Sequence, residues 1–468
     1  MSKGAHKEVL NRLSEIVGED GVERRPAQRR YFAEDALRGR GGFAEPKSQP
    51  LAVVRPPDAI AIASVLSVCS LMNIAVVPYG AGTGLMGGAR TTGPGIVLDM
   101  VRLNSVEVQP GDRLAWAGAG AVLKDVDIQM RRHGLCLGHD PWTYPVATVG
   151  GTLSTNGLGY RGGRYGGMAA QALALEVALA DGTLLRSRAV RRSSTGPDLT
   201  RLFTGAEGIM GVITAAALEA FPIPERQELR AYNFSRFEDG FAVIDAMASL
   251  GMRPSLLDYG EEHASPWPDL VSREDEPPLL YLGFEGWWEE VEASLQRAER
   301  LIGEHGGREL PESKARSFWD SRHVVAERFA RGRRRSQQSW RSPDIAFEFM
   351  HVALPPSKVL PFRELCHERT EVEGVGLLEC GLWTAPDFFS CVLVLPKSMG
   401  GQQRLGDVMD SLLAAAQDFG GSMEYVHGAG LRLAHLMENE HGSGLDVLRR
   451  LKAALDPAGV LNPGKLGL

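Results

Sequence analysis

A glycine-rich stretch is the first part of this sequence whose residues could do chemistry. Residues 77–88 read Val-Pro-Tyr-Gly-Ala-Gly-Thr-Gly-Leu-Met-Gly-Gly, and five of the nine residues 80–88 are glycines. Because glycine permits positive φ angles and close approach, such a loop can turn its backbone N–H groups toward an anion. A pyrophosphate is the usual ligand of such a loop, and a plain structural turn is the alternative.

A second stretch of small residues covers residues 140–167. It contains Thr148, Gly150-Gly151 and Ser154-Thr155-Asn156-Gly157. Glycines and small hydroxyls leave room for a flat ligand and supply hydrogen bonds to it. The segment 205–213, Gly-Ala-Glu-Gly-Ile-Met-Gly-Val-Ile, continues the same composition further along the chain.

Alternating strands and helices must position these stretches. Apolar runs predict strands at residues 51–54 and 74–78, on either side of a helix at 58–72. Further strands are expected at 96–100 and 114–120, before a helix at 121–133. The glycine-rich loop therefore follows directly from the end of a strand in an α/β unit.

Composition limits the class of protein. The chain has 468 residues, 44% of them hydrophobic and 23% charged, which is typical of a globular protein with two domains. Its formal net charge of −7 argues against nucleic acid as the main partner. The five cysteines include no C-x-x-C pair, so the sequence supports neither a disulfide framework nor an iron–sulfur cluster.

The same features bear on location. No secretory signal is visible, and the uncharged window at residues 59–78 is interrupted by Asn73 and Pro78, so it predicts a buried helix and strand and not a membrane span. We expect a cytoplasmic protein, with peripheral attachment to the inner face of the membrane as the alternative.

Taken in order, these blocks resemble the FAD-binding domain of the vanillyl-alcohol oxidase superfamily. The branch with the most similar pattern holds D-lactate dehydrogenases, glycolate oxidase flavin subunits and alkyl-dihydroxyacetone-phosphate synthases. The resemblance implies an α+β fold, in which a two-subdomain FAD-binding domain of the p-cresol methylhydroxylase type carries an α+β cap domain with an antiparallel sheet. It also implies a helical segment at 1–45, the FAD-binding domain at 46–225, the cap at 226–425 and a C-terminal segment at 426–468 that returns to the FAD-binding domain.

The resemblance carries cofactor contacts onto positions of this sequence. It implies that the glycine-rich loop wraps the pyrophosphate, that the second stretch lines the flavin and that the third segment holds the adenine side. The residues are Pro78, Tyr79, Gly80, Ala81, Gly82, Thr83, Gly84, Thr148, Gly151, Thr155, Asn156, Gly157, Glu207, Gly208, Val212 and Ile213, together with Asn462 near the C-terminus. In the family that this sequence resembles, a covalent link to the flavin needs a His or Cys at defined positions. His139 is the one unusual histidine near these motifs, but we expect noncovalent FAD.

Oxidation of a 2-hydroxy acid by flavin needs a base for the hydroxyl proton and a cation for the carboxylate. His427 lies in an H-G-x-G that resembles the family's active-site histidine, and imidazole titrates near neutrality. Arg322 resembles the arginine of the family's L-W-x-x-R motif, and a guanidinium pairs with a carboxylate through two parallel hydrogen bonds. A packing role for His427 and a surface position for Arg322 are the alternatives. His351 is expected to pack in the core.

Two departures from the family pattern narrow the expectation. Where metal-dependent relatives carry H-x-G-D-G-N-x-H, residues 379–391 contain no histidine, so we expect no metal and a larger or less polar substrate. The consecutive histidines of the ether-lipid synthases are reduced here to Tyr425-Val426-His427, which argues against a transferase.

The sequence thus predicts an FAD-dependent oxidoreductase that oxidises a 2-hydroxy acid, like D-lactate or glycolate or larger, by hydride transfer to flavin N5. Its partners would be that acid or alcohol and an electron acceptor: a quinone, a cytochrome, another carrier or dioxygen. A homodimer is compatible with these observations. The alternatives are a synthase-like FAD transferase and a non-catalytic flavin subunit of a larger dehydrogenase.

Overall fold

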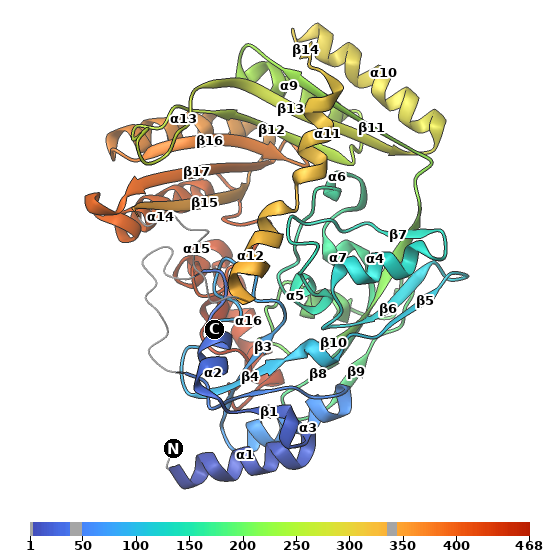
Figure 1. Ribbon diagram of the computed structural model, residues 1–468, viewed down its shortest axis with the longest axis vertical. Coiled ribbons are helices and arrows are strands. Elements are labelled where there is room, and N and C mark those ends of the chain that lie inside the picture. The colour runs from blue at the N-terminus through green and yellow to red at the C-terminus, as the bar shows by residue number, and fades with distance from the viewer. Residues whose placement is uncertain (1–2, 38–48, 335–343) are drawn as a thin grey trace.

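The computed structural model describes residues 3–37, 49–334 and 344–468, and it has two stacked parts (Figure 1). The lower part contains two sheets, and the upper part is built on one large sheet covered by helices. The expected α+β class is confirmed. Within the described residues, no helix is both long and apolar enough to cross a membrane.

The first sheet carries the glycine-rich loop at the end of one of its strands. Its order is β1-β2-β4-β3, with the last three strands parallel. The Asp58 carboxylate accepts a hydrogen bond from the N–H of Ala61 (2.8 Å) and so caps the helix that connects two of these strands. The elements are α1 (Lys3–Val17), η1 (Glu19–Gly21), β1 (Val22–Glu23), α2 (Pro26–Phe32), β2 (Ala52–Val54), α3 (Ala59–Leu71), β3 (Ala75–Tyr79), β4 (Gly95–Asp99) and η3 (Met100–Arg102).

The second sheet is antiparallel and carries the other two cofactor motifs in its connections. Its order is β5-β6-β10-β8-β9, and β7 pairs with the far end of β10. Its elements are β5 (Val106–Gln109), β6 (Leu114–Gly118), α4 (Leu123–Arg131), β7 (Leu135–Leu137), α5 (Val149–Ser154), α6 (Gly162–Tyr165), α7 (Met168–Gln171), β8 (Ala172–Ala178), β9 (Leu184–Arg186), α8 (Leu199–Phe203) and β10 (Val212–Pro222).

The upper part is a seven-stranded antiparallel sheet in the order β14-β11-β13-β12-β16-β17-β15. One face is covered by helices, and the other faces the lower part (Figure 1). The elements are β11 (Arg226–Asn233), α9 (Phe237–Ser249), β12 (Leu256–Glu262), β13 (Glu276–Gly286), α10 (Trp288–Glu304), β14 (Arg308–Glu309), α11 (Glu312–Ser321), α12 (Val324–Arg334), β15 (Ile345–Ala353), α13 (Pro356–Val372), β16 (Gly376–Trp383), β17 (Phe388–Pro396), η4 (Lys397–Met399) and α14 (Gly401–Asp418).

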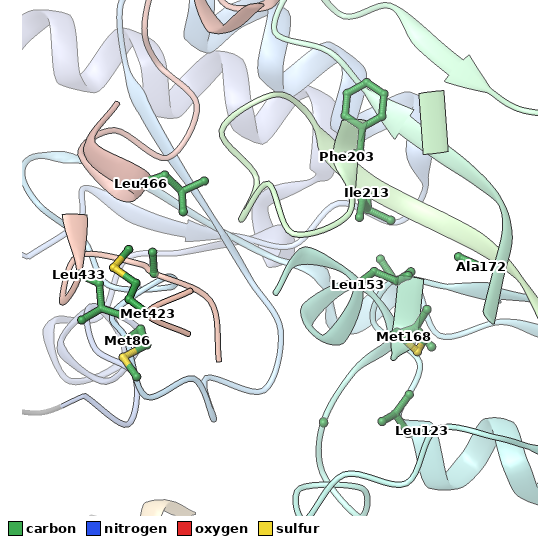
Figure 2. Packing of buried hydrophobic residues seen from close by; sticks show 14 of the residues in the cluster. Met86, Leu123, Leu153, Met168, Ala172, Phe203, Ile213, Met423, Leu433 and Leu466 are labelled. Atoms are coloured by element: carbon green, nitrogen blue, oxygen red, sulfur yellow. The ribbon is translucent and has the colours of Figure 1, made fainter. Parts of the chain in front are cut away.

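The C-terminal segment leaves the upper part and packs on the lower one. The N–H of Asn462 donates to the carbonyl of Val76 on β3 (2.8 Å), and the Val76 N–H donates to the carbonyl of Val460 (2.8 Å). Figure 2 shows Met423, Leu433 and Met86 of the glycine-rich loop packed together. The elements here are η5 (Ala434–Leu436), α15 (Met437–His441), α16 (Ser443–Leu455) and η6 (Lys465–Gly467). The predicted domain boundaries themselves stay predictions.

Candidate active site

The cofactor motifs, which are far apart in the sequence, line one cavity in the lower part. All the predicted cofactor residues except Asn156 and Asn462 lie on its wall. His139, Trp142 and His427 also line it. The predicted contacts with FAD stay predictions, but the fold brings their residues to a common surface.

The close approach of two chain segments explains why the cavity wall needs residues without side chains. A Cβ atom on Gly80 would lie 2.3 Å from Oγ1 of Thr148, which is shorter than any normal contact. Thr148 in turn caps α5, because its hydroxyl accepts a hydrogen bond from the N–H of Gly151 (3.4 Å). Gly82 has a φ of +62°, a conformation that residues with side chains rarely adopt. The glycine-rich loop and the second small-residue stretch are therefore packed directly against each other.

Unsatisfied polar atoms at this cavity fit a polar cofactor. Oε2 of Glu207 and both ring nitrogens of His139 are buried without a hydrogen-bond partner among the described residues. Burial raises the pKa of Glu207 to about 7 and lowers the pKa of His139 to about 4. Buried polar groups are normally paired, so a ligand with its own donors and acceptors matches this wall. The residues present therefore fit FAD.

The two remaining asparagines support the wall from behind. Oδ1 of Asn156 accepts a hydrogen bond from the N–H of Ala169 (3.1 Å). Nδ2 of Asn462 donates to the carbonyl oxygens of Gly88 (2.8 Å) and Glu207 (2.6 Å). Asn462 thus joins the glycine-rich loop to the third cofactor segment.

A second cavity, of about 740 Å³, lies between the lower part and the open face of the upper sheet. Its wall is mainly aromatic and aliphatic, and it includes Trp142, Tyr160, Phe329, Phe347, Phe349, Leu382, Trp383 and Tyr425. The two cavities share Thr83, Trp142, Val426 and His427. His427 therefore lies where the cofactor cavity opens into the apolar one, as a residue acting between a flavin and a substrate must.

A buried carboxylate holds the imidazole of His427. Nδ1 of His427 lies 3.5 Å from Oε2 of Glu424, whose Oε1 accepts hydrogen bonds from the backbone N–H groups of Val426 (2.7 Å) and His427 (2.9 Å). Burial alone would raise the pKa of Glu424, but the charge and hydrogen bonds of His427 lower it below its usual value. The ionised Glu424 therefore orients the ring of His427.

His351 is not the core residue that the sequence suggests. It extends from β15 into the apolar cavity, and its ring packs edge-to-face on His427 with centroids 4.5 Å apart. His351, Glu424 and His427 place ligand atoms within 4.8 Å of one another, an arrangement that could hold a metal ion. The expectation of no metal here stays a prediction.

Arg322 lies at the C-terminal end of α11 and lines the apolar cavity. Its guanidinium stacks on Trp319 at 3.8 Å, and its Nε donates to Oδ2 of Asp140 (3.0 Å). Oδ1 of Asp140 also lies 2.8 Å from Nε2 of His323. Burial would raise the pKa of Asp140, but His323 and Arg322 together lower it below its usual value. Nη2 of Arg322 has no hydrogen-bond partner among the described residues, so it can bind a substrate carboxylate.

The sequence patterns did not single out Glu424, Asp140 or His323. Glu424 lies three residues before His427, and that spacing was the one local signal for it. Asp140 lies 182 residues from Arg322, and no local pattern connects them.

Comparison with known proteins agrees with this geometry. The FAD binding domain family matches residues 50–188, and the family described as FAD linked oxidases, C-terminal domain, matches residues 223–466. A D-lactate dehydrogenase of Archaeoglobus fulgidus is 30% identical over 423 residues, which cover 88% of this chain and 90% of that protein. The glycolate oxidase subunit GlcD of Bacillus subtilis is 24% identical over 98% of this chain and 97% of its own length.

Solved structures show the same fold. Substrate-bound p-cresol methylhydroxylase superposes with a TM-score of 0.79 at 17% identity, covering 100% of this chain and 98% of that one. An alkyldihydroxyacetonephosphate synthase superposes with a TM-score of 0.76 at 16% identity, covering 98% of this chain and 84% of that one. Because the sequence identities are only 16% and 17%, these two similarities show a common fold and carry no conclusion about the reaction.

Fold and site together define an FAD-dependent oxidoreductase. More particularly, the chain belongs to the FAD-linked oxidase family that includes D-lactate dehydrogenases and glycolate oxidase flavin subunits. The predicted family and the predicted FAD cofactor are confirmed.

Proposed function

We propose that this chain oxidises a 2-hydroxy acid whose side chain is larger and less polar than the methyl group of lactate. The apolar cavity carries this proposal, because His427 and Arg322 lie on its wall among aromatic side chains. Named relatives that are D-lactate dehydrogenases and a glycolate oxidase subunit support a substrate of the 2-hydroxy acid class.

In this proposal Arg322 binds and orients the substrate carboxylate. Its Nε is held by Asp140 and its plane rests on Trp319, so the guanidinium is fixed before the substrate arrives. A preorganised cation loses little entropy on binding, which favours both affinity and orientation. The carboxylate then directs the hydroxyl-bearing carbon toward the junction of the two cavities.

His427 takes the hydroxyl proton. Its Nδ1 lies next to the Glu424 carboxylate, so we assign Nε2 to the substrate. The carboxylate of Glu424 stabilises the imidazolium that results, because its opposite charge lies 3.5 Å from Nδ1. When bound, FAD would supply the acceptor for the hydride that leaves the same carbon.

Aromatic side chains on the strands of the upper sheet would hold the rest of the substrate. Phe347 and Phe349 on β15 and Trp383 on β16 line the cavity. Each methylene buried against them is worth about 0.8 kcal/mol, or roughly a fourfold gain in kcat/KM if the contact persists in the transition state.

Anaerobic flavin bleaching tests the proposal. The purified FAD-loaded chain is mixed with a series of D- and L-2-hydroxy acids, from glycolate and lactate to acids with long aliphatic or aromatic side chains. We expect one enantiomer of the larger acids to bleach the flavin faster than lactate does. Bleaching that falls steadily as the side chain grows would contradict the size assignment.

Two further outcomes separate the alternatives. An alkyl-dihydroxyacetone phosphate that alone perturbs the flavin would indicate a transferase. A yellow protein that no hydroxy acid or alcohol bleaches would indicate a flavin subunit whose catalysis belongs to a partner. After bleaching, the rate of reoxidation by dioxygen, a quinone analogue and a cytochrome c ranks the electron acceptors.

A further inference from the structure

Four side chains with metal-binding atoms converge on the helix-covered face of the upper sheet. They are Glu261 at the end of β12, His263 just beyond it, His367 on α13 and Cys380 on β16. Their ligand atoms all lie within 4.8 Å of one another. This group is separate from the active site, because alternate residues of β16, Glu379 and Gly381, line the apolar cavity on the opposite face.

The sheet register and one helix bring the four together. Glu261 and Cys380 are directly opposite in the antiparallel ladder between β12 and β16, so their side chains lie on the same face. His263 follows Glu261 by two residues, and its N–H donates to the carbonyl of Leu378 (2.9 Å), which keeps it along the same strand edge. His367 reaches the group from α13, which packs on β16.

The two imidazoles have a ligand atom each that the protein leaves unsatisfied. Nε2 of His263 and Nε2 of His367 are buried without a hydrogen-bond partner among the described residues. They lie 3.6 Å and 3.7 Å from Oε1 of Glu261, too far for hydrogen bonds, and the two rings are 4.9 Å apart. Two buried nitrogens aimed at one carboxylate are what a bound cation would satisfy.

Nearby charges balance a divalent ion at this position. Arg363, one turn before His367, donates from Nε to Oε1 of Glu261 (2.6 Å) and also lies 3.4 Å from Oε1 of Glu238. With Cys380 as a thiolate, the three negative charges of Glu261, Glu238 and Cys380 would balance the positive charges of Arg363 and one divalent cation. Metal binding would release the Cys380 thiol proton to solvent, because cysteine binds a metal ion as the thiolate.

We propose that Glu261, His263, His367 and Cys380 form a four-ligand site for a divalent transition metal of the zinc class. Two imidazoles, one thiolate and one carboxylate suit Zn²⁺, and four protein ligands with no open position are typical of a structural site. The ion would join α13 to the sheet and brace the strands whose other face forms the substrate cavity. This site goes beyond the proposed function and does not depend on it.

Co²⁺ is the probe for this site. The FAD-loaded chain is dialysed against a chelator and then titrated with Co²⁺, and its spectrum is compared with that of the metal-free FAD-loaded protein. We expect tight binding of one ion per chain, with a thiolate-to-cobalt band and visible bands of tetrahedral Co²⁺. Zn²⁺ should displace the cobalt and abolish these bands. Failure to bind an ion, or binding without a thiolate band, would overturn the proposal.

Four variants locate the ion. His367→Ala, at a partly exposed position, should lose the stoichiometric metal, and Cys380→Ser should lose the thiolate band. Cys366→Ser, a change at another buried thiol on α13, is the matched control and should keep both signals. His427→Ala should also keep the metal. Metal that survives His367→Ala but disappears in His427→Ala would place the ion at the active site and refute this assignment.

Discussion

The cofactor cavity and the apolar cavity are neighbours, yet their walls are made of opposite kinds of groups. The first is walled by backbone, glycines and small hydroxyls from three short motifs of the lower part. The second is walled mainly by large side chains, most of them from strands and helices of the upper part, with Trp142 and Tyr160 from the lower part. His427 and Trp142 belong to both walls, so the proposed reaction would take place where the two cavities meet.

The difference matches what we propose that each cavity recognises. A pyrophosphate and a flat ring system require close backbone approach, which few sequences other than glycine-rich ones permit. An organic acid requires one cation, one base and a shaped apolar surface, which many combinations of side chains provide. Substitutions in the first cavity should therefore remove the cofactor, whereas those in the second should change rate or specificity and leave the cofactor bound.

The largest effect is expected at Gly80. Gly80→Val places side-chain atoms where Oγ1 of Thr148 lies, so the purified variant should contain little or no FAD. Gly93→Ala is the control, because a Cβ there meets no atom within 4 Å. The ratio of flavin absorbance to protein absorbance measures the outcome. A fully loaded Gly80→Val protein would show that the loop does not form the cofactor wall.

His427→Ala should separate chemistry from cofactor binding. We expect FAD to be retained while anaerobic flavin reduction slows by about 10²–10⁴-fold, the usual contribution of a positioned base. His435→Ala, at a histidine exposed outside both cavities, should reduce its flavin at the normal rate. Stopped-flow bleaching measures both variants, and an undiminished rate in His427→Ala would disprove the base assignment.

Arg322→Lys keeps the charge but removes the planar fork. The loss of charge-assisted hydrogen bonds costs about 1.5–3 kcal/mol, so kcat/KM for the hydroxy acid should fall by roughly 10–100-fold with FAD content unchanged. Arg316→Lys, on the exposed side of the same helix, is the matched control. If an uncharged alcohol of the same shape loses as much as the acid does, Arg322 does not bind the carboxylate.

Asp258 gives the smallest effect, through pH. Burial, with a contribution from Glu379, raises the pKa of Asp258 to about 7, whereas its unfolded value is about 4. The folded state therefore binds more protons between these values, and this group's contribution to stability falls as pH rises through that window. Asp258→Asn should make the fall in the free energy of unfolding across this pH window smaller, by on the order of 1–3 kcal/mol. The figure is kept low because the carboxyl group is partly solvated. Denaturant unfolding at about pH 5 and about pH 8 measures it, and an unchanged difference between the two pH values would contradict the assignment.

The sequence by itself determined which segments line the cofactor cavity. The segments 77–88, 148–157 and 205–213 carry their information locally, because a glycine that allows close approach is needed whatever packs around it. The same holds for the expected strand before the loop, which the structure shows as β3 (Ala75–Tyr79), and for the α+β class. His427 was also singled out locally, by the short motif that contains it, and its role as the base stays a prediction.

Only the tertiary structure decided which residues meet around the apolar cavity and on the opposite face of the upper sheet. The ion pair between Asp140 and Arg322, the contact between His351 and His427, and the convergence of Glu261 with Cys380 all join residues far apart in the chain. Strand register sets the pairing of Glu261 with Cys380 and the face of β15 from which His351 extends, and a shift of one residue would turn these side chains to the opposite face of the sheet. Asp140 lies in a loop and Arg322 at the end of α11, so the packing of the two parts brings them together. Periodicity predicts that a strand exists, but long-range pairing energies choose which strands become neighbours, and so which side chains share a site.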